Sequence, residues 1–238
     1  MKKKLYIAHR GLYNKNIPEN SMAAFALAMA EDMAIELDVQ LTKDDKVIVF
    51  HDSNLKRMTN IDKKVYKCSY EEISKLRLQN SKETIPLLED VLKMVGGKVY
   101  LDIEIKHYKN WTKTVMAVLE VMENYKGKYT IKSFNPYISY LYKKNAPDID
   151  CGVLIGNMSN SKLPKFIKNI ISNLKYIKLY RPDFVAYNID IINEDIVNKM
   201  QKLNIPLQVY TLNTLDKLKK GQKISDILIC ENISMKKD

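Results

Sequence analysis

Short apolar runs that fit β-strands alternate with helix-like stretches along almost the whole chain. The nine strand-like runs are KLYIAH (4–9), AIELDV (34–39), VIVFHD (47–52), VYLDIEIK (99–106), KYTIKSF (128–134), CGVLIG (151–156), FVAYNID (184–190), PLQVYTL (206–212) and DILIC (226–230). Helix-like stretches lie between them, for example at 22–33, 111–125, 162–177 and 192–203. This alternation predicts a parallel sheet whose strands are connected by helices.

The second and third runs are too close in sequence for a parallel connection. Only the residues QLTKDDK separate them, whereas a parallel crossover needs about a dozen residues or more. We therefore expect an antiparallel hairpin with a two-residue turn at Asp44-Asp45, which places Asp38 opposite His51. A longer turn would shift this register by one or two residues. Eight parallel strands remain, the number found in a TIM-type barrel.

The 238 residues are predicted to form one α/β domain over 1–238, a TIM-type eight-stranded barrel with an antiparallel hairpin after its second strand. Residues 53–98 exceed one crossover and are expected to form a short insertion with helices in SYEEISKLRL and LLEDVLKMV. No apolar run approaches the roughly 20 residues that cross a bilayer. The apolar stretch after the basic amino terminus is too short for a secretory signal, so the expected location is cytoplasmic.

The cysteines and the net charge bound the chemistry further. Cys68, Cys151 and Cys230 lack the paired spacing of a zinc site and are expected to be buried thiols in a reducing compartment. The net charge of +11 favours anionic partners, namely phosphate-bearing substrates, acidic membrane surfaces or nucleic acid. Because the lysines are spread along the whole chain, the charge alone does not choose among these partners.

Carboxylates alternate with apolar residues in two of the predicted strands. Glu36 and Asp38 lie two residues apart in AIELDV and therefore face the same side, as do Asp102 and Glu104 in LDIEIK. The plain alternative for such a pattern is one solvated strand face. Active sites of these barrels gather at the carboxyl ends of the strands, which favours Glu104 over the deeper Asp102. Glu36, Asp38 and Glu104 are predicted to hold one divalent cation, and three carboxylates suit calcium or magnesium better than zinc.

Basic residues end the neighbouring strands. The first strand runs into His9, Arg10 and Gly11, and the hairpin ends at His51. Both histidines are expected at the mouth of the barrel beside the carboxylates. Gly11 permits a sharp turn, Arg10 can bind a phosphoryl oxygen through its planar guanidinium, and Lys106 can hold an anion.

The segments AHRGLYNKNIPENSMAAFALAM, IELDVQLTKDDKVIVFHDSNLKRMT, IPLLEDVL, LDIEIK and IKSFN occur in this order and resemble the successive signatures of the glycerophosphodiester phosphodiesterase family. The resemblance continues weakly in QVYTLN and DILICEN, so it covers most of the chain. It implies a TIM barrel that cleaves glycerophosphodiesters to glycerol 3-phosphate and an alcohol with one divalent cation, Ca²⁺ or Mg²⁺. It also implies that the glycerol 2-hydroxyl attacks first and that water then opens a cyclic phosphate.

The resemblance assigns roles position by position. The acid/base pair is His9 and His51, the metal ligands are Glu36, Asp38 and Glu104, and the substrate-binding residues are Arg10, Lys106 and Tyr210. Glu19 and Asn20 support the site or cap the next helix, with direct substrate contact as the alternative. Five positions depart from the family pattern: Asp32 and Asp45 stand where Gly is usual, Ser21 where Thr is usual, Tyr210 where Trp is common, and Glu231 where Asp is usual. The third histidine, His107, is expected to face solvent.

Two alternatives remain open at this point. The same site could hydrolyse lysophospholipids in the manner of a lysophospholipase D, which an apolar lining and a basic rim would favour. A non-catalytic barrel that binds anions or nucleic acid would be expected to have lost one of the five acid/base and metal residues, and all five are present. A glycosidase would not explain the paired histidines. The expected partner is a small-molecule glycerophosphodiester and not nucleic acid, while contact with an anionic membrane surface, the head group and the acid and base roles stay open.

Overall fold

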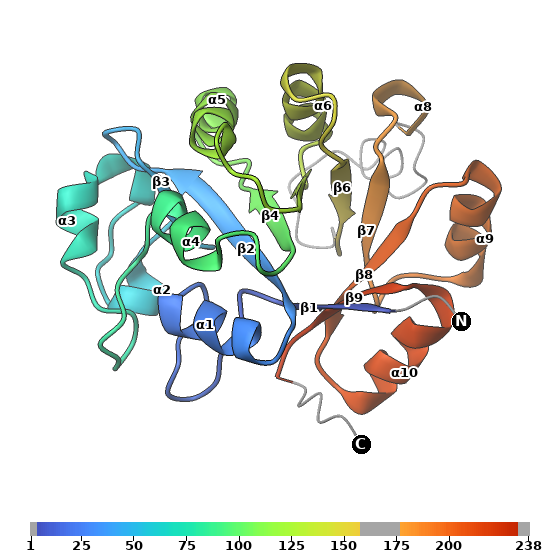
Figure 1. The fold of residues 1–238 in the computed structure, drawn as a ribbon, viewed down its shortest axis with the longest axis horizontal. Coiled ribbons are helices and arrows are strands. Elements are labelled where there is room, and N and C mark those ends of the chain that lie inside the picture. Colours follow the sequence, from blue (N-terminus) through green and yellow to red (C-terminus); the bar gives the residue numbers. More distant parts are fainter. Residues whose placement is uncertain (1–3, 158–176, 233–238) are drawn as a thin grey trace.

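The computed structural model describes residues 4–157 and 177–232, in which strands occupy the centre and helices surround them (Figure 1). The strands of these residues are β1 (Leu5–Ala8), β2 (Ala34–Leu41), β3 (Val47–Val49), β4 (Leu101–Ile105), β5 (Tyr129–Ser133), β6 (Cys151–Ile155), β7 (Phe184–Asn188), β8 (Leu207–Leu212) and β9 (Ile227–Cys230). Each coincides with one of the nine strand-like runs of the sequence, so these predictions are confirmed.

Eight of these strands close into a parallel barrel. β1 pairs with both β2 and β9, which joins the two ends of the sheet and gives the ring β1-β2-β4-β5-β6-β7-β8-β9. β3 pairs with the carboxyl-terminal half of β2 in the antiparallel sense, and Ile48 of β3 forms a further antiparallel bridge to Leu87. The prediction of a TIM-type barrel with an antiparallel hairpin after the second strand is therefore confirmed.

The hairpin turn is longer than predicted. The Thr42 amide bonds at 3.1 Å to a carbonyl four residues further on, and the last of the three intervening residues, Asp45, has φ of 63°. A left-handed residue at this place is typical of three-residue hairpin loops. Asp38 therefore lies opposite Phe50, whose amide donates to the Asp38 carbonyl at 2.9 Å. The predicted two-residue turn, and with it the pairing of Asp38 with His51, is wrong by one residue.

Helices flank the barrel on its outer face (Figure 1). Within the described residues they are α1 (Met22–Ala30), α2 (Lys56–Thr59), α3 (Tyr70–Ser74), α4 (Leu88–Val95), α5 (Trp111–Met122), α6 (Pro136–Asn145), α8 (Ile177–Tyr180), α9 (Glu194–Leu203) and α10 (Leu215–Ile224), with a 3₁₀ turn η1 (Val65–Lys67). The helices predicted at 22–33, 111–125 and 192–203 are confirmed with shorter ends. The helix predicted at 162–177 lies outside the described residues except for its last residue.

The alternation of β2 separates an apolar core from a polar barrel interior. Ile35, Leu37 and Val39 are fully buried in the large hydrophobic cluster that the barrel wall forms with the helices. The intervening side chains of Glu36 and Asp38 are also buried, but on the opposite face of the strand. Both faces of β2 are therefore buried, and its two carboxylates are almost completely shielded from bulk water.

The insertion predicted between residues 53 and 98 is present and has its own small core. Its helices α2, α3 and α4 lie on the side of the barrel that carries β3 (Figure 1). Ile48 and Phe50 from the hairpin pack there with insertion residues such as Leu55 and Ile73. This core fixes the hairpin whose end carries His51.

Two further expectations can be compared with the structure. Cys68, Cys151 and Cys230 are free thiols and buried, as predicted. Among the helices of residues 4–157 and 177–232, none combines the length and apolar character needed to span a membrane.

Gly11, at the end of β1, has φ of 79°, and a Cβ there would lie 2.9 Å from atoms of both Ala24 and Phe25. Gly11→Ala is therefore expected to lower the free energy of unfolding by about 2–5 kcal/mol, because overpacking adds to the cost of a left-handed conformation. The matched control is Gly96→Ala, with φ of 55° and its nearest contact at 3.8 Å, which should cost only about 1–2 kcal/mol. Urea denaturation measures both, and equal losses would contradict the packing argument.

Candidate active site

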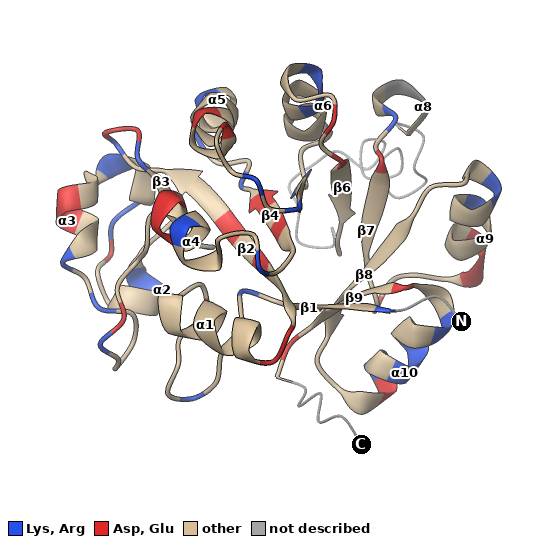
Figure 2. Ribbon diagram, in the orientation of Figure 1, with Lys and Arg blue, Asp and Glu red and all other residues tan. Residues whose placement is uncertain are grey.

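The registers of β2, β4 and β5 arrange charged side chains in two layers inside the barrel. Glu36 lies beside Asp102 in one layer, and Asp38, Glu104 and Lys132 lie side by side in the next layer, nearer the carboxyl ends of the strands. Figure 2 shows the acidic positions of β2 and β4 next to each other in the middle of the molecule. The carboxylates of β2 and β4 therefore lie beside one another, as the alternation in their sequences predicted.

Three of these carboxylates form a compact cluster. Glu36, Asp38 and Glu104 each offer an oxygen within 4.8 Å of the others, and all three are buried. Burial, together with the negative charges of Asp38 and Glu36, raises the pKa of Glu104 even though Lys106 opposes the shift. The cluster thus concentrates three carboxylates in a buried space, and its hard oxygen donors fit a divalent cation such as calcium or magnesium.

Lys106 lies against this cluster. Its Nζ is 2.5 Å from Glu104 Oε1 and 3.2 Å from Asp38 Oδ1, and the residue is only 4% exposed. Burial alone would lower the pKa of Lys106, but these carboxylates raise it above its ordinary value. Burial likewise opposes ionisation of Asp38, yet Lys106, His51 and Arg10 together hold the pKa of this carboxyl well below its usual range. Lys106 therefore provides a fixed positive charge beside the carboxylates.

Each predicted catalytic histidine is held by a carboxylate at Nδ1. His9 Nδ1 lies 2.7 Å from Glu231 Oε2, and His51 Nδ1 lies 2.6 Å from Asp52 Oδ1. A carboxylate at Nδ1 favours the tautomer that carries its proton there, which leaves Nε2 available for proton transfer. His9 Nε2 is 4.0 Å from Glu36 Oε2, so this imidazole adjoins the carboxylate cluster.

Both imidazoles line one cavity of about 120 Å³ at the carboxyl ends of the strands. One part of its wall is polar and the other is largely apolar, and the lining residues are His9, Arg10, Glu36, His51, Glu104, Lys132, Phe134, Leu154, Tyr210, Thr211 and Ile229. Tyr210 thus lies where substrate-binding was predicted, with its ring edge-on to that of Phe134 at 6.5 Å between centroids. His107 is exposed, as expected.

A network of ion pairs joins the two histidine sides. The Arg10 side chain donates to Glu19 at 2.8 Å, and Arg57 donates to both oxygens of Glu19 at 2.7 and 2.9 Å. Arg57 Nε also donates to Asp52 at 2.6 Å. Burial opposes ionisation of Glu19, but Arg57 and Arg10 lower its pKa below the ordinary value. Glu19 therefore holds Arg10 at the cavity and ties it to the Asp52 that orients His51.

Asn20 supports a metal-ligand candidate and does not cap the helix. Its Nδ2 donates to Asp38 Oδ2 at 2.9 Å, and its Oδ1 accepts from the Asp38 amide at 3.3 Å. Asn20 has φ of 53°, and the following residue, Ser21, is the N-cap of α1, accepting from the Ala24 amide. Of the roles that the sequence left open for Asn20, the geometry fits support of the site through Asp38.

Burial lowers the pKa of His51 below its ordinary value, and the positive charges of Lys106 and Arg10 act in the same direction. The carboxylates of Asp38 and Asp52 oppose this shift without cancelling it. The neutral imidazole is therefore the favoured form of His51 near neutral pH.

Several residues of the site were missed in the sequence. Asp52, Arg57 and Lys132 were not singled out, and Glu231 was noted only as a departure from a pattern. Asp52 and Arg57 could have been found within the segment HDSNLKRMT, where they lie five residues apart near His51. For Lys132, the signal was its alternation with apolar residues in KYTIKSF.

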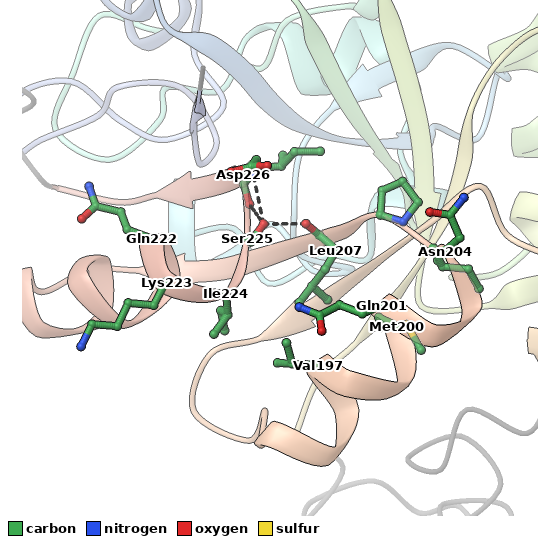
Figure 3. A pocket seen from close by; sticks show the side chains of 13 residues that line it. Val197, Met200, Gln201, Asn204, Leu207, Gln222, Lys223, Ile224, Ser225 and Asp226 are labelled. Carbon is green, nitrogen blue, oxygen red and sulfur yellow. Dashed lines mark hydrogen bonds between the residues drawn. The ribbon is translucent and has the colours of Figure 1, made fainter. Parts of the chain in front are cut away.

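A larger cavity of about 730 Å³ lies at the opposite end of the barrel, between the C-terminal parts of α9 and α10 (Figure 3). Its lining contains no histidine, and Asp226 is its one acidic residue. The Ser225 hydroxyl in this lining already donates to the Leu207 carbonyl. The candidate acid/base and cation-binding residues lie at the smaller cavity, which is therefore the candidate active site.

Comparison with known proteins agrees with this geometry. The model of the Glycerophosphoryl diester phosphodiesterase family matches residues 9–228. A glycerophosphodiester phosphodiesterase of Caldanaerobacter subterraneus subsp. tengcongensis is 41% identical over 165 residues, which are 64% of this chain and 67% of that protein. One from Bacillus altitudinis is 30% identical over 224 residues, covering 89% and 87% of the two chains.

The fold also has solved counterparts. The structure of an Oleispira antarctica phosphodiesterase in complex with the product sn-glycerol-3-phosphate superimposes with a TM-score of 0.81 at 22% identity. The match covers 95% of this chain and 92% of that one. At this identity the likeness concerns the fold, and it extends over the whole barrel.

Proposed function

The chain belongs to the glycerophosphoryl diester phosphodiesterase family of hydrolases, and we propose that it cleaves glycerophosphodiesters to glycerol 3-phosphate and an alcohol by two-histidine acid/base catalysis with a divalent cation. The observation that carries this proposal is the convergence of His9, His51 and the three-carboxylate cluster on one cavity. A phosphodiester resists hydrolysis because its anionic charge repels nucleophiles and its alkoxide leaves poorly. Positive charges at the site counter the repulsion of the nucleophile, and a proton donor allows the oxygen to leave as an alcohol.

Arg10 and Lys106 bind the phosphoryl oxygens in this proposal. Both are positively charged, and both lie beside the carboxylate cluster, since Arg10 Nε is 3.4 Å from Asp38 Oδ2 and Lys106 Nζ is 3.2 Å from Asp38 Oδ1. Glu36, Asp38 and Glu104 would hold a calcium or magnesium ion next to them. Such an ion, when bound, polarises a phosphoryl oxygen and stabilises the charge that develops on it. Tyr210 lines the same cavity as Arg10.

His51 acts as the general base of the first step, because its lowered pKa favours the neutral imidazole. It removes the proton of the glycerol 2-hydroxyl, whose oxygen attacks phosphorus and forms a cyclic phosphate. His9, oriented by Glu231, donates a proton to the alcohol oxygen as its bond to phosphorus breaks. In the second step His9 takes a proton from water, the water oxygen attacks phosphorus, and His51 returns its proton to the 2-oxygen as the bond between that oxygen and phosphorus breaks.

The direct test is turnover by the purified full-length chain. Glycerophosphocholine, glycerophosphoethanolamine and lysophosphatidylcholine are each supplied with calcium or magnesium, and released glycerol 3-phosphate and choline are measured separately. Glycerol 3-phosphate release from the first two substrates supports the proposal. Preferred cleavage of lysophosphatidylcholine would instead assign a lysophospholipase D activity, which the apolar part of the cavity wall at Phe134, Leu154 and Ile229 would suit. Absence of cleavage of all three substrates would reject a phosphodiesterase of this class.

The pH dependence of kcat/KM gives a second test. The base must be neutral, and the pKa of His51 is lowered from its ordinary 6.5, so activity should persist at pH 6.5 and its acid limb should lie below that pH. Asp52→Asn removes a carboxylate that raises the pKa of His51, so the acid limb should move to still lower pH. Rates measured from about pH 4.5 to 8 bracket the ordinary histidine range. An acid limb above pH 6.5, or an upward shift in the variant, would contradict His51 as the base.

A further inference from the structure

Beneath the carboxylate cluster lies a buried ion pair to which the proposed reaction gives no role. Lys132 is 1% exposed and Asp102 is fully buried, and Lys132 Nζ lies 2.7 Å from Asp102 Oδ2. The other oxygen of Asp102 accepts from the Thr130 hydroxyl at 2.9 Å, and Thr130 in turn accepts from the Tyr100 hydroxyl at 2.8 Å. Both oxygens of Asp102 are therefore occupied, and the carboxylate is fixed in place.

Lys132 also contacts a metal-ligand candidate. Its Nζ lies 3.5 Å from Glu36 Oε1, while Glu36 Oε2 accepts from the Arg10 amide at 3.0 Å. The Glu36 carboxylate is thus held at one oxygen by a buried ammonium and at the other by the backbone. Lys132 lines the catalytic cavity as well, so its charge acts directly on that space.

The two buried lysines divide the four carboxylates between them. Lys106 pairs with Asp38 and Glu104, and Lys132 pairs with Asp102 and Glu36. The strand register places Lys132 beside Glu104, yet the Lys132 ammonium bonds to Asp102 in the adjacent layer of side chains. Lys106 already occupies the upper carboxylates, which explains this choice.

We propose that Lys132, held by Asp102, is a positioning residue that fixes Glu36 and, by its charge, weakens binding of a divalent cation to the three-carboxylate cluster. This inference rests on the cation site of the proposed function. A positive charge against one ligand oxygen opposes a second cation at the same carboxylate. Asp102 offsets this charge incompletely, because the Lys132 ammonium itself lies 3.5 Å from Glu36 of the cluster, whereas the Asp102 oxygens are bonded to Thr130 and to Lys132. The consequence is a cation that exchanges with solution.

The test measures cation affinity and not turnover. Calcium and magnesium are titrated calorimetrically into the full chain and into Asp102→Asn/Lys132→Met, which removes both charges of the pair and leaves Glu36 held by the Arg10 amide. The dissociation constant of the double variant is expected to fall roughly tenfold, because the competing charge is gone. Lys132→Arg keeps the charge and should bind with an affinity close to that of the wild type.

A matched control removes an ion pair on the outside of the barrel. Lys143 and Asp183 pair at 2.9 Å between α6 and the start of β7, so Lys143→Met/Asp183→Asn should leave cation affinity unchanged. Unchanged or weaker affinity in the Asp102/Lys132 double variant, at unaltered melting temperature and circular dichroism, would overturn the inference while leaving the cation site intact. A wild-type chain that binds neither ion would overturn the cation site and this inference together.

Discussion

Replacing His51 with alanine is expected to lower kcat on glycerophosphocholine by roughly 10²–10⁴-fold, the usual contribution of a positioned proton acceptor. The side chain is 29% exposed and its hydrogen-bonded neighbour Asp52 keeps both contacts to Arg57. The free energy of unfolding should therefore change by no more than about 0.5 kcal/mol. Steady-state kinetics and thermal melts of the same preparation measure the two quantities.

The third histidine supplies the control. His107 is exposed and does not line the cavity, so His107→Ala should retain activity close to that of the wild type. His9→Ala should lose activity to a similar degree as His51→Ala, because one imidazole cannot serve both proton transfers. A His51→Ala enzyme with more than about a tenth of wild-type activity would exclude His51 as the base.

Removal of divalent cations is expected to abolish turnover, and added calcium or magnesium should restore it. The physical reason is the concentrated negative charge of Glu36, Asp38 and Glu104, whose oxygens lie within 4.8 Å of one another inside the barrel. Glu104→Gln removes one charged ligand and should raise the cation concentration needed for half-maximal kcat by roughly tenfold or more. Activity after chelation, followed by titration with each ion, measures this dependence.

A surface carboxylate tests whether the effect is local. Asp45 pairs with Lys113 on the exposed hairpin turn, and Asn tolerates the left-handed conformation of that position. Asp45→Asn should therefore leave the cation dependence unchanged. Full turnover in excess chelator would reject a cation-dependent mechanism, whatever the behaviour of Glu104→Gln.

The barrel could be predicted from sequence because its signals are local. Apolar runs separated by helix-length stretches mark the parallel strands, and the seven residues QLTKDDK between two runs are too few for anything but a hairpin. The exact turn could not be predicted, because two- and three-residue loops differ by a single residue. Asp45 in a left-handed conformation, with Asp44 accepting from the Tyr70 amide, stabilises the longer loop. The Tyr70 amide that bonds to Asp44 belongs to α3 of the insertion, which lies outside the hairpin sequence.

The candidate site divides in the same way. Glu36, Asp38 and Glu104 follow from strand alternation, and the structure brings them together as expected. The pairing of Lys132 with Asp102 follows from β4–β5 register and from the prior occupation of Glu104 by Lys106. Such a choice between equivalent partners is settled only by the packed interior.

The partner of His9 illustrates a second limit. Glu231 is separated from it by 222 residues, and the two meet because β1 lies against β9 when the barrel closes. The nearby sequence of His9 contains no sign of this contact. Only the complete ring of strands places the two side chains together.

This seam between β1 and β9 has a consequence for biosynthesis. During synthesis on the ribosome, the segments that carry His9, His51 and the three-carboxylate cluster leave the exit tunnel long before β9 does. Until that final strand docks, His9 lacks its Glu231 partner and one wall of the cavity is absent. The cavity between the two histidines is therefore complete only after β9 has been synthesised and has paired with β1.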